Sequence, residues 1–186
     1  MRMIFWLVYF AWFVSEVWLG RMRRSDSTDH KREDKNSLLI IWLVIAFAMP
    51  AASIVSTVFP ARIADIYWIG YFGLALIITG MALRFMVIRS LGRFFTVDVA
   101  IREGHQLKQD GFYALVRHPS YFASWLSFVG FGVSLNNWIS LAIVSTLVLG
   151  AFLYRIHIEE KVLTGQFGDA YLRYKKTTKA IIPFMW

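Results

Sequence analysis

Long apolar runs are the feature of this sequence that most limits its possible folds. A helix needs about 20 apolar residues to cross the roughly 30 Å of bilayer hydrocarbon. Five runs of suitable length and composition cover residues 4–19, 37–59, 66–88, 121–135 and 138–156. The chain is 58% hydrophobic, against about 45 to 50% in soluble domains. We therefore expect an all-α polytopic membrane protein, a single membrane domain over residues 1–186 with about five transmembrane helices.

The charged residues are distributed unevenly along the chain. Lys and Arg number 20 against 12 Asp and Glu, for a net charge of +8. Six basic residues lie in each of the segments 20–36, 84–117 and 155–179, which leaves Arg2 and Arg62 for the opposite side of the membrane. The positive-inside rule then places the amino terminus outside and the carboxyl terminus in the cytoplasm. We expect membrane lipids and not nucleic acid as partners, and the small size favours a bacterial inner membrane.

Several kinds of chemistry are excluded by what the sequence lacks. It contains no cysteine, which excludes disulfides, thiolate metal sites and a cysteine nucleophile. The four histidines lack metal-binding spacing, so no metal is expected. Neither the G-x-S-x-G elbow nor the G-x-G-x-x-G loop of soluble Rossmann-type enzymes is present. Glu16 lies within the first apolar run with no visible counter-charge, and it is expected to face the bundle interior.

Most of the polar sequence outside the first loop falls in two segments, a loop at 89–119 and a carboxyl-terminal tail at 157–186. The pair Asn136–Asn137 predicts a tight hairpin between the fourth and fifth runs, which would bring the two segments together. We expect both segments to be cytoplasmic and to form the cofactor site. In the loop, the alternation of TVDVAI predicts a short strand at 96–101.

The tail is expected to contain one short helix. Gly165 and Gly168 should interrupt the continuation of the fifth membrane helix. Asp169 can then cap an amphipathic helix that carries Tyr171 and Tyr174 on one face. These tyrosines suit either anchoring at the membrane interface or contact with an adenine ring.

Basic and acidic side chains in the two segments form two motifs. The first, GFYALVRHPSY, covers residues 111–121, and the second, RIHIEEKVLTGQFGDAYLRYKK, covers 155–176. An isolated Arg117–His118 pair at a helix end is most simply explained by snorkelling toward lipid headgroups. Its combination with a nearby tyrosine and a pair of glutamates favours a binding site instead.

These motifs, with LGRF at 91–94 and GH-L at 104–107, resemble those of the isoprenylcysteine carboxyl methyltransferases and their bacterial relatives. The similarity covers roughly residues 91–184. The resemblance implies an integral membrane methyltransferase that binds S-adenosyl-L-methionine at the cytoplasmic membrane edge, while a lipid-like acceptor reaches it from the bilayer. The cofactor-binding residues that we expect on this basis are Arg117, His118, Pro119, Tyr121, Glu159, Glu160 and Tyr171.

The residue types also suit this cofactor on chemical grounds. Carboxylates such as Glu159 and Glu160 suit an ammonium group or ribose hydroxyls, and Arg117 or His118 suits a carboxylate. An acceptor carboxylate has a reference pKa of about 3.5 and needs no general base at neutral pH, so catalysis would depend on alignment and on excluding water. Arg155 lies one helical turn before Glu159, and we predict that these two residues are catalytic, Arg155 by holding the acceptor carboxylate. The alternative is an ordinary helix-surface ion pair.

The leading hypothesis is methyl transfer to the carboxylate of an isoprenylcysteine-type acceptor. A phospholipid amine or a thiol is an alternative acceptor within the same class of membrane methyltransferase. An NADPH-dependent membrane sterol-type reductase is a different class, and it should carry more helices and further basic residues for the 2′-phosphate. A non-catalytic membrane protein with an inherited fold is a third. The sequence leaves the acceptor and the oligomeric state open.

Overall fold

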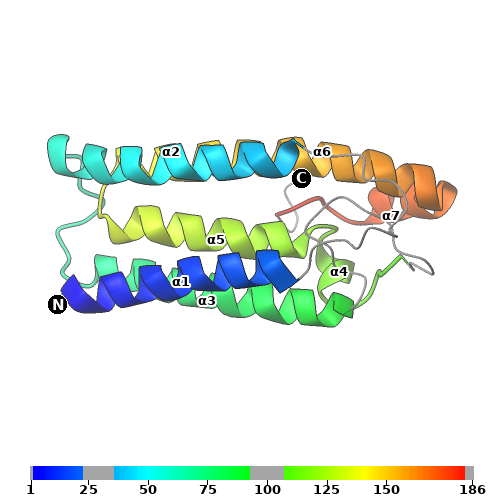
Figure 1. Ribbon diagram of the computed structural model, residues 1–186, viewed down its shortest axis with the longest axis horizontal. Coiled ribbons are helices and arrows are strands. Elements are labelled where there is room, and N and C mark those ends of the chain that lie inside the picture. The colour runs from blue at the N-terminus through cyan, green and yellow to red at the C-terminus, as the bar shows by residue number, and fades with distance from the viewer. Residues whose placement is uncertain (1, 23–35, 93–106, 183–186) are drawn as a thin grey trace.

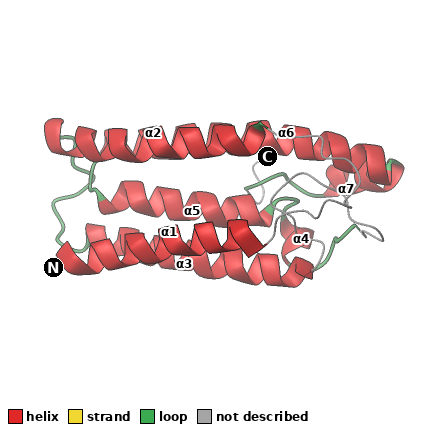
Figure 2. Cartoon of the chain, in the orientation of Figure 1, coloured by secondary structure: helices red, strands yellow, loops and turns green. Residues whose placement is uncertain are grey.

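The computed structural model describes residues 2–22, 36–92 and 107–182. The regular structure of these residues is helical, apart from one isolated β-bridge (Figure 2). The described helices are α1 (Arg2–Met22), α2 (Ser37–Val58), α3 (Ile69–Leu91), α4 (Phe112–Leu115), α5 (Pro119–Ser134), α6 (Trp138–Phe167) and α7 (Asp169–Thr177). The all-α prediction is confirmed, whereas the strand predicted at 96–101 lies outside the described residues.

The long helices lie roughly parallel in an elongated bundle (Figure 1). α2 and α6 run side by side, α1 lies next to α3, and α5 occupies the space between the two pairs. α3 and α5 approach closely because glycine faces the partner backbone at the contact: a Cβ on Gly80 would lie 2.6 Å from the carbonyl oxygen of Ala123. This packing fixes the position of α5, which begins at Pro119 of the RHPSY motif.

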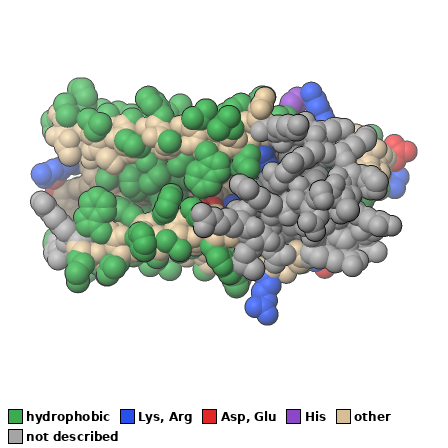
Figure 3. Space-filling model, in the orientation of Figure 1, with side chains coloured by type: hydrophobic (Ala, Val, Ile, Leu, Met, Phe, Trp, Pro, Cys, Tyr) green, Lys and Arg blue, Asp and Glu red, His purple; other side chains and the backbone are tan. Residues whose placement is uncertain are grey.

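Of the described helices, α2, α3 and α6 are long and apolar enough to cross a membrane. The apolar part of α1, Met3–Leu19, and the 16-residue α5 are shorter. Hydrophobic side chains cover the long sides of the bundle, as expected for a surface in contact with lipid, and charged side chains gather toward its ends (Figure 3).

Several predicted helix ends need correction. The predicted span 66–88 begins three residues later, at Ile69, because the residues before it form turns. The predicted span 138–156 continues to Phe167 as a helix of 30 residues, so Gly165 does not interrupt it. Gly168 does end it, with the positive φ of 52° that favours glycine after a helix. The part of α6 before Arg155 is apolar, and the rest extends beyond the apolar region as a polar helix.

At one end of the bundle, the predicted hairpin between α5 and α6 is confirmed. Asn136 takes a φ of 50°, and its side chain accepts hydrogen bonds from the backbone N–H groups of Ile63 and Ala64 at 3.2 and 3.1 Å. Asn137 donates to the carbonyl of Phe59 at 2.7 Å and caps α6 by accepting from Ser140 at 3.0 Å. The asparagine pair therefore also holds the connection between α2 and α3.

At the opposite end, the loop before α5 meets the tail after α7. Val116 and Lys179 form a parallel β-bridge, in which Arg117 N–H donates to the Lys179 carbonyl at 2.8 Å. The next residue continues the pairing, since His118 N–H donates to the Ala180 carbonyl at 2.9 Å. The predicted meeting of the two polar segments is thus confirmed.

Glu16 has a counter-charge that the sequence did not reveal. Arg84 on α3 places its Nε 3.2 Å from Glu16 Oε1, within the bundle. The same arginine donates through Nη1 to the carbonyl and the hydroxyl of Ser120, at 3.1 and 3.2 Å. A groove of about 670 Å³ between α1 and α3 is lined by apolar side chains and by Glu16 and Arg84. The ion pair therefore connects this groove with the first turn of α5.

Candidate active site

The RHPSY motif lies at the start of α5, with Arg117 and His118 just before the helix and the other three residues in its first turn. Pro119 occupies the first turn of this helix, where its missing N–H costs no hydrogen bond. His118 precedes it and is 5% exposed. Pro119 makes no side-chain hydrogen bond, and its contribution to the site is to start the helix that holds Tyr121.

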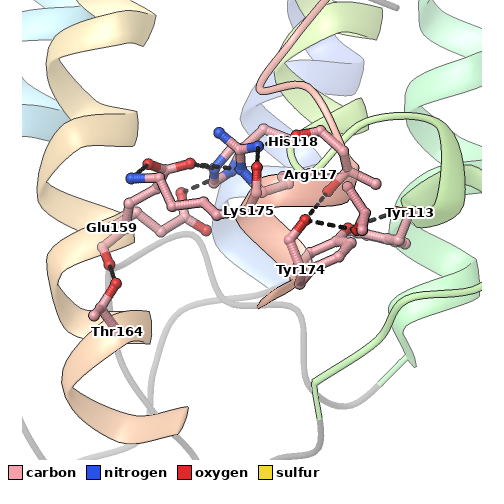
Figure 4. Close-up of polar contacts among 10 residues, drawn as sticks. Tyr113, Arg117, His118, Glu159, Thr164, Tyr174 and Lys175 are labelled. Carbon is pink, nitrogen blue, oxygen red and sulfur yellow. Dashed lines mark hydrogen bonds and ion pairs between the residues drawn. The ribbon is translucent and has the colours of Figure 1, made fainter. Parts of the chain in front are cut away.

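Arg117 joins three parts of the fold. Its Nε donates to Glu160 Oε1 on α6 at 2.8 Å. Its Nη1 donates to the carbonyl of Lys175 at 3.2 Å and to the carbonyl of Thr178. The carbonyl groups at the end of a helix lack partners within that helix, so the arginine caps α7 while it holds the glutamate. Figure 4 shows Arg117 and His118 facing α6 across this contact.

The carboxylate of Glu160 lies among three basic groups. Beside the contact with Arg117, its Oε1 lies 3.4 Å from His118 Nε2, and its Oε2 lies 2.6 Å from Lys175 Nζ. Burial raises the pKa of Glu160, but the hydrogen bonds from His118, Lys175 and Arg117 together lower it by more than burial raises it. The pKa therefore lies well below its ordinary value. Glu160 is therefore ionised at neutral pH.

Glu159 belongs to a second network that extends into the bundle. Tyr121 donates its hydroxyl hydrogen to Glu159 Oε2 at 3.0 Å and accepts from Arg155 Nε at 2.9 Å. Arg155 also donates through Nη1 to the hydroxyl of Ser37 on α2 at 2.7 Å. Arg155 is only 3% exposed, so its side chain does not lie on the surface of the helix. His118 lies between the networks, with Nδ1 3.8 Å from Glu159 Oε2.

The two tyrosines of α7 face inward. Tyr171 and Tyr174 are 1% and 5% exposed, so the interpretation as anchors at the membrane interface is wrong. Tyr174 donates to the carbonyl of Tyr113 on α4 at 2.5 Å and so holds α7 against the loop. The hydroxyl of Tyr171 is buried and has no hydrogen-bond partner among the residues that the structure describes. Burial, and then the charges of Glu160 and Glu159, raise its pKa, so it is a neutral donor.

The structure thus brings the predicted site residues to one place. It divides their side chains between the Glu160 network, with Arg117 and His118, and the Glu159 network, with Tyr121 and Arg155. Sequence reasoning missed Lys175, Ser37 and Thr178. Lys175 lies in the tail motif at 155–176 and could have been identified from it, whereas no sequence signal marks Ser37 or Thr178. Asp169 begins α7, but the N-cap position is taken by Gly168.

The fold and the site define a helical membrane protein with a buried, charged site at one end of the bundle. Residues 73–165 match the model of the isoprenylcysteine carboxyl methyltransferase (ICMT) family, which is half of the chain. The chain belongs to this family, and it is an integral membrane protein with several apolar helices. Enzymes of the family use S-adenosylmethionine.

Individual relatives agree with this assignment. Protein-S-isoprenylcysteine O-methyltransferase B of Arabidopsis thaliana is 39% identical over 64% of this chain and 61% of its own length. A protein of Oryza sativa subsp. indica named "Probable protein-S-isoprenylcysteine O-methyltransferase" is 32% identical over 77% of this chain and 75% of its own. The match spans 61% of both Arabidopsis relatives.

A solved structure has a similar fold. It is that of the eukaryotic intramembrane Ras methyltransferase ICMT, with a TM-score of 0.61 and 27% sequence identity. The similarity covers 82% of this chain and 54% of that one. The family match at 73–165 contains the site residues from Arg117 to Glu160, but neither Ser37 of α2 nor the α7 residues that close the site.

Proposed function

We propose that this protein is a methyltransferase that uses S-adenosylmethionine to methylate the carboxylate of a lipid-like acceptor of the isoprenylcysteine type. The observation that carries the proposal is the pair of networks around Glu159 and Glu160, two residues that lie within the part of the chain that matches the ICMT family. The names of the Arabidopsis relatives support this acceptor.

The residues of the site fit the cofactor. Glu160 is ionised, and Glu159 is 31% exposed at its side chain. Both carboxylates suit an ammonium group or ribose hydroxyls, and the buried hydroxyl of Tyr171 offers a donor without a partner among the described residues. Bound here, S-adenosylmethionine would supply an electrophilic methyl group on a sulfonium. Because the hydrogen bonds of Arg117 go to Glu160 and to carbonyl groups at the end of α7, we propose that Arg117 positions this glutamate.

Arg155 and Tyr121 have the second role in the proposal. Arg155 is fixed by Ser37 and by Tyr121, which in turn orients Glu159. A buried guanidinium supplies positive charge toward which an acceptor carboxylate can be oriented. Since that carboxylate is already ionised at neutral pH, the residues do not need to remove a proton, and they accelerate the reaction by alignment and by excluding water.

The membrane arrangement gives the acceptor a route to the site. We propose five spans, with α1 and α5 added to the three long apolar helices, the amino terminus outside and the polar end in the cytoplasm. The groove between α1 and α3 has apolar walls and reaches Arg84, which contacts Ser120 beside Tyr121. Its volume of about 670 Å³ suits an apolar chain.

Methyl transfer to defined acceptors tests the proposal. The purified protein would be incubated with methyl-labelled S-adenosylmethionine and N-acetyl-S-farnesylcysteine, phosphatidylethanolamine or a farnesyl thiol. We expect label on the farnesylcysteine, and alkali should release it as methanol because an ester is hydrolysed while N-methyl and S-methyl groups are not. Glu160→Gln serves as the impaired control. Alkali-stable label on the amine or the thiol would contradict the proposed acceptor, and binding of NADPH without S-adenosylmethionine would contradict the proposed class.

A further inference from the structure

The two carboxylate oxygens of Glu160 have different surroundings. Oε1 lies 2.8 Å from Arg117 Nε and 3.4 Å from His118 Nε2. Oε2 lies 2.6 Å from Lys175 Nζ on α7. Figure 4 shows the lysine approaching α6 beside Arg117. One oxygen therefore faces a guanidinium and an imidazole, and the other faces a primary ammonium group.

These basic groups differ in how firmly they are held. Arg117 is 9% exposed at its side chain and also binds the carbonyl groups of Lys175 and Thr178. His118 is 4% exposed at its side chain, and its backbone is paired with Ala180. Lys175 is 42% exposed, and its ammonium is carried on a flexible four-carbon stem. Moving Lys175 into solvent therefore disturbs the fold least.

We propose that the ammonium of Lys175 occupies the position on Glu160 Oε2 that the α-ammonium group of S-adenosylmethionine takes, so that the two compete. This inference rests on the proposed function and assigns Glu160 to the amino-acid part of the cofactor. Both groups are primary ammonium ions with three N–H donors, and either satisfies the same carboxylate oxygen. In the absence of the cofactor, Lys175 pairs with Oε2 of this largely buried carboxylate, while Arg117 and His118 hold Oε1.

If the two ammonium groups compete, removal of the Lys175 ammonium should strengthen ligand binding instead of weakening it. Loss of a partly exposed ion pair changes an equilibrium about two- to fivefold, so Lys175→Met should tighten the binding of S-adenosylhomocysteine by about that factor. Lys175→Arg places a two-pronged donor on the same carboxylate, so it should weaken binding. A lysine that binds the cofactor directly would show the opposite effect for Lys175→Met.

The test measures equilibrium binding by calorimetry in detergent or nanodiscs. The ligands are S-adenosylhomocysteine and 5′-methylthioadenosine, which lacks the amino-acid part and therefore cannot compete with Lys175. Lys176→Met is the matched control, because Lys176 is an exposed neighbour on the same helix and its loss changes the net charge equally. We expect only the two Lys175 variants to change affinity, and only for S-adenosylhomocysteine.

Each other outcome contradicts the inference. Weaker or unchanged binding of S-adenosylhomocysteine by Lys175→Met would show that the lysine is a ligand or a bystander. Equal tightening by Lys176→Met, or equal tightening for 5′-methylthioadenosine, would show a general effect of charge or of pocket shape. Failure of the wild-type protein to bind S-adenosylhomocysteine would overturn the proposed function together with this inference, whereas the other results leave the proposed function intact.

Discussion

Replacement of Tyr121 by Phe tests the network that joins Arg155 to Glu159. The substitution removes one oxygen atom and keeps the aromatic ring, whose centroid lies 5.3 Å from that of Phe152. The lost hydroxyl accepts from Arg155 Nε at 2.9 Å and donates to Glu159 Oε2 at 3.0 Å. Core packing is preserved, so the effect of Tyr121→Phe should come from these two contacts.

The two contacts differ in what replaces them. The side chain of Glu159 is 31% exposed, so water can take the place of the hydroxyl there. Arg155 is 3% exposed, and loss of a buried hydrogen bond to a charged group costs about 1.5 to 3 kcal/mol. If that loss appears in the transition state, kcat/KM for methyl transfer falls about 10- to 100-fold.

The assay compares methyl transfer by wild type, Tyr121→Phe and the control Tyr154→Phe, which changes a 49% exposed tyrosine on α6. Thermal unfolding of each variant checks that the bundle stays folded. A folded Tyr121→Phe enzyme with wild-type kcat/KM would refute the role of the network. A double-mutant cycle with Glu159→Gln should show a coupling energy of about 0.5 to 3 kcal/mol, and strictly additive effects would also refute it.

Three further predictions concern topology, packing and pH. A reporter at Asn137 should be extracytoplasmic and one after Trp186 cytoplasmic; the same side for both would contradict the five-span arrangement. Gly80→Val should prevent folding, because its Cβ would lie 2.6 Å from a backbone carbonyl oxygen of α5. The control Gly150→Val should fold, since a Cβ there meets nothing within 4 Å. Wild-type thermal stability of both variants would contradict the packing of α3 against α5. Because the pKa of Glu160 is lowered in the fold, ionised Glu160 stabilises the protein at pH values above the ordinary glutamate pKa of about 4.3. This contribution to stability is lost as the pH falls below that value. Wild type and Glu160→Gln should therefore differ in stability at pH 7 and converge in acid.

The sequence predicted most of the helices because lipid imposes a simple rule on composition. A run of apolar residues long enough to span the bilayer is visible without knowledge of its neighbours. Helix ends follow weaker local signals, which explains the errors at Ile69 and Phe167. Gly165 is exposed, with nothing within 4 Å of an added Cβ. The helix continues through it because one glycine lowers helix stability by only about 1 kcal/mol relative to alanine.

The candidate site was predictable where its residues share a motif and unpredictable where the fold brings distant residues together. Arg117, His118 and the glutamate pair were identified from their motifs. The pairing of Glu16 with Arg84 depends on how α1 lies against α3, and α1 carries no motif that indicates this. The contact of Ser37 with Arg155 likewise depends on the packing of α2 against α6. Pairings of this kind require the three-dimensional arrangement.

The adjacent glutamates are explained by the geometry of α6. Successive residues of an α-helix point about 100° apart, so Glu159 and Glu160 face different surroundings and share His118 as a neighbour between them. Glu160 faces α7 and the loop before α5, where basic groups hold it ionised, while Glu159 faces Tyr121 and, through it, the buried Arg155. The side chain of His118 lies between them, 3.8 Å from Glu159 and 3.4 Å from Glu160. A doublet on one helix therefore serves two networks, one that holds the tail against the site and one that reaches into the bundle, toward the proposed route of the lipid-like acceptor.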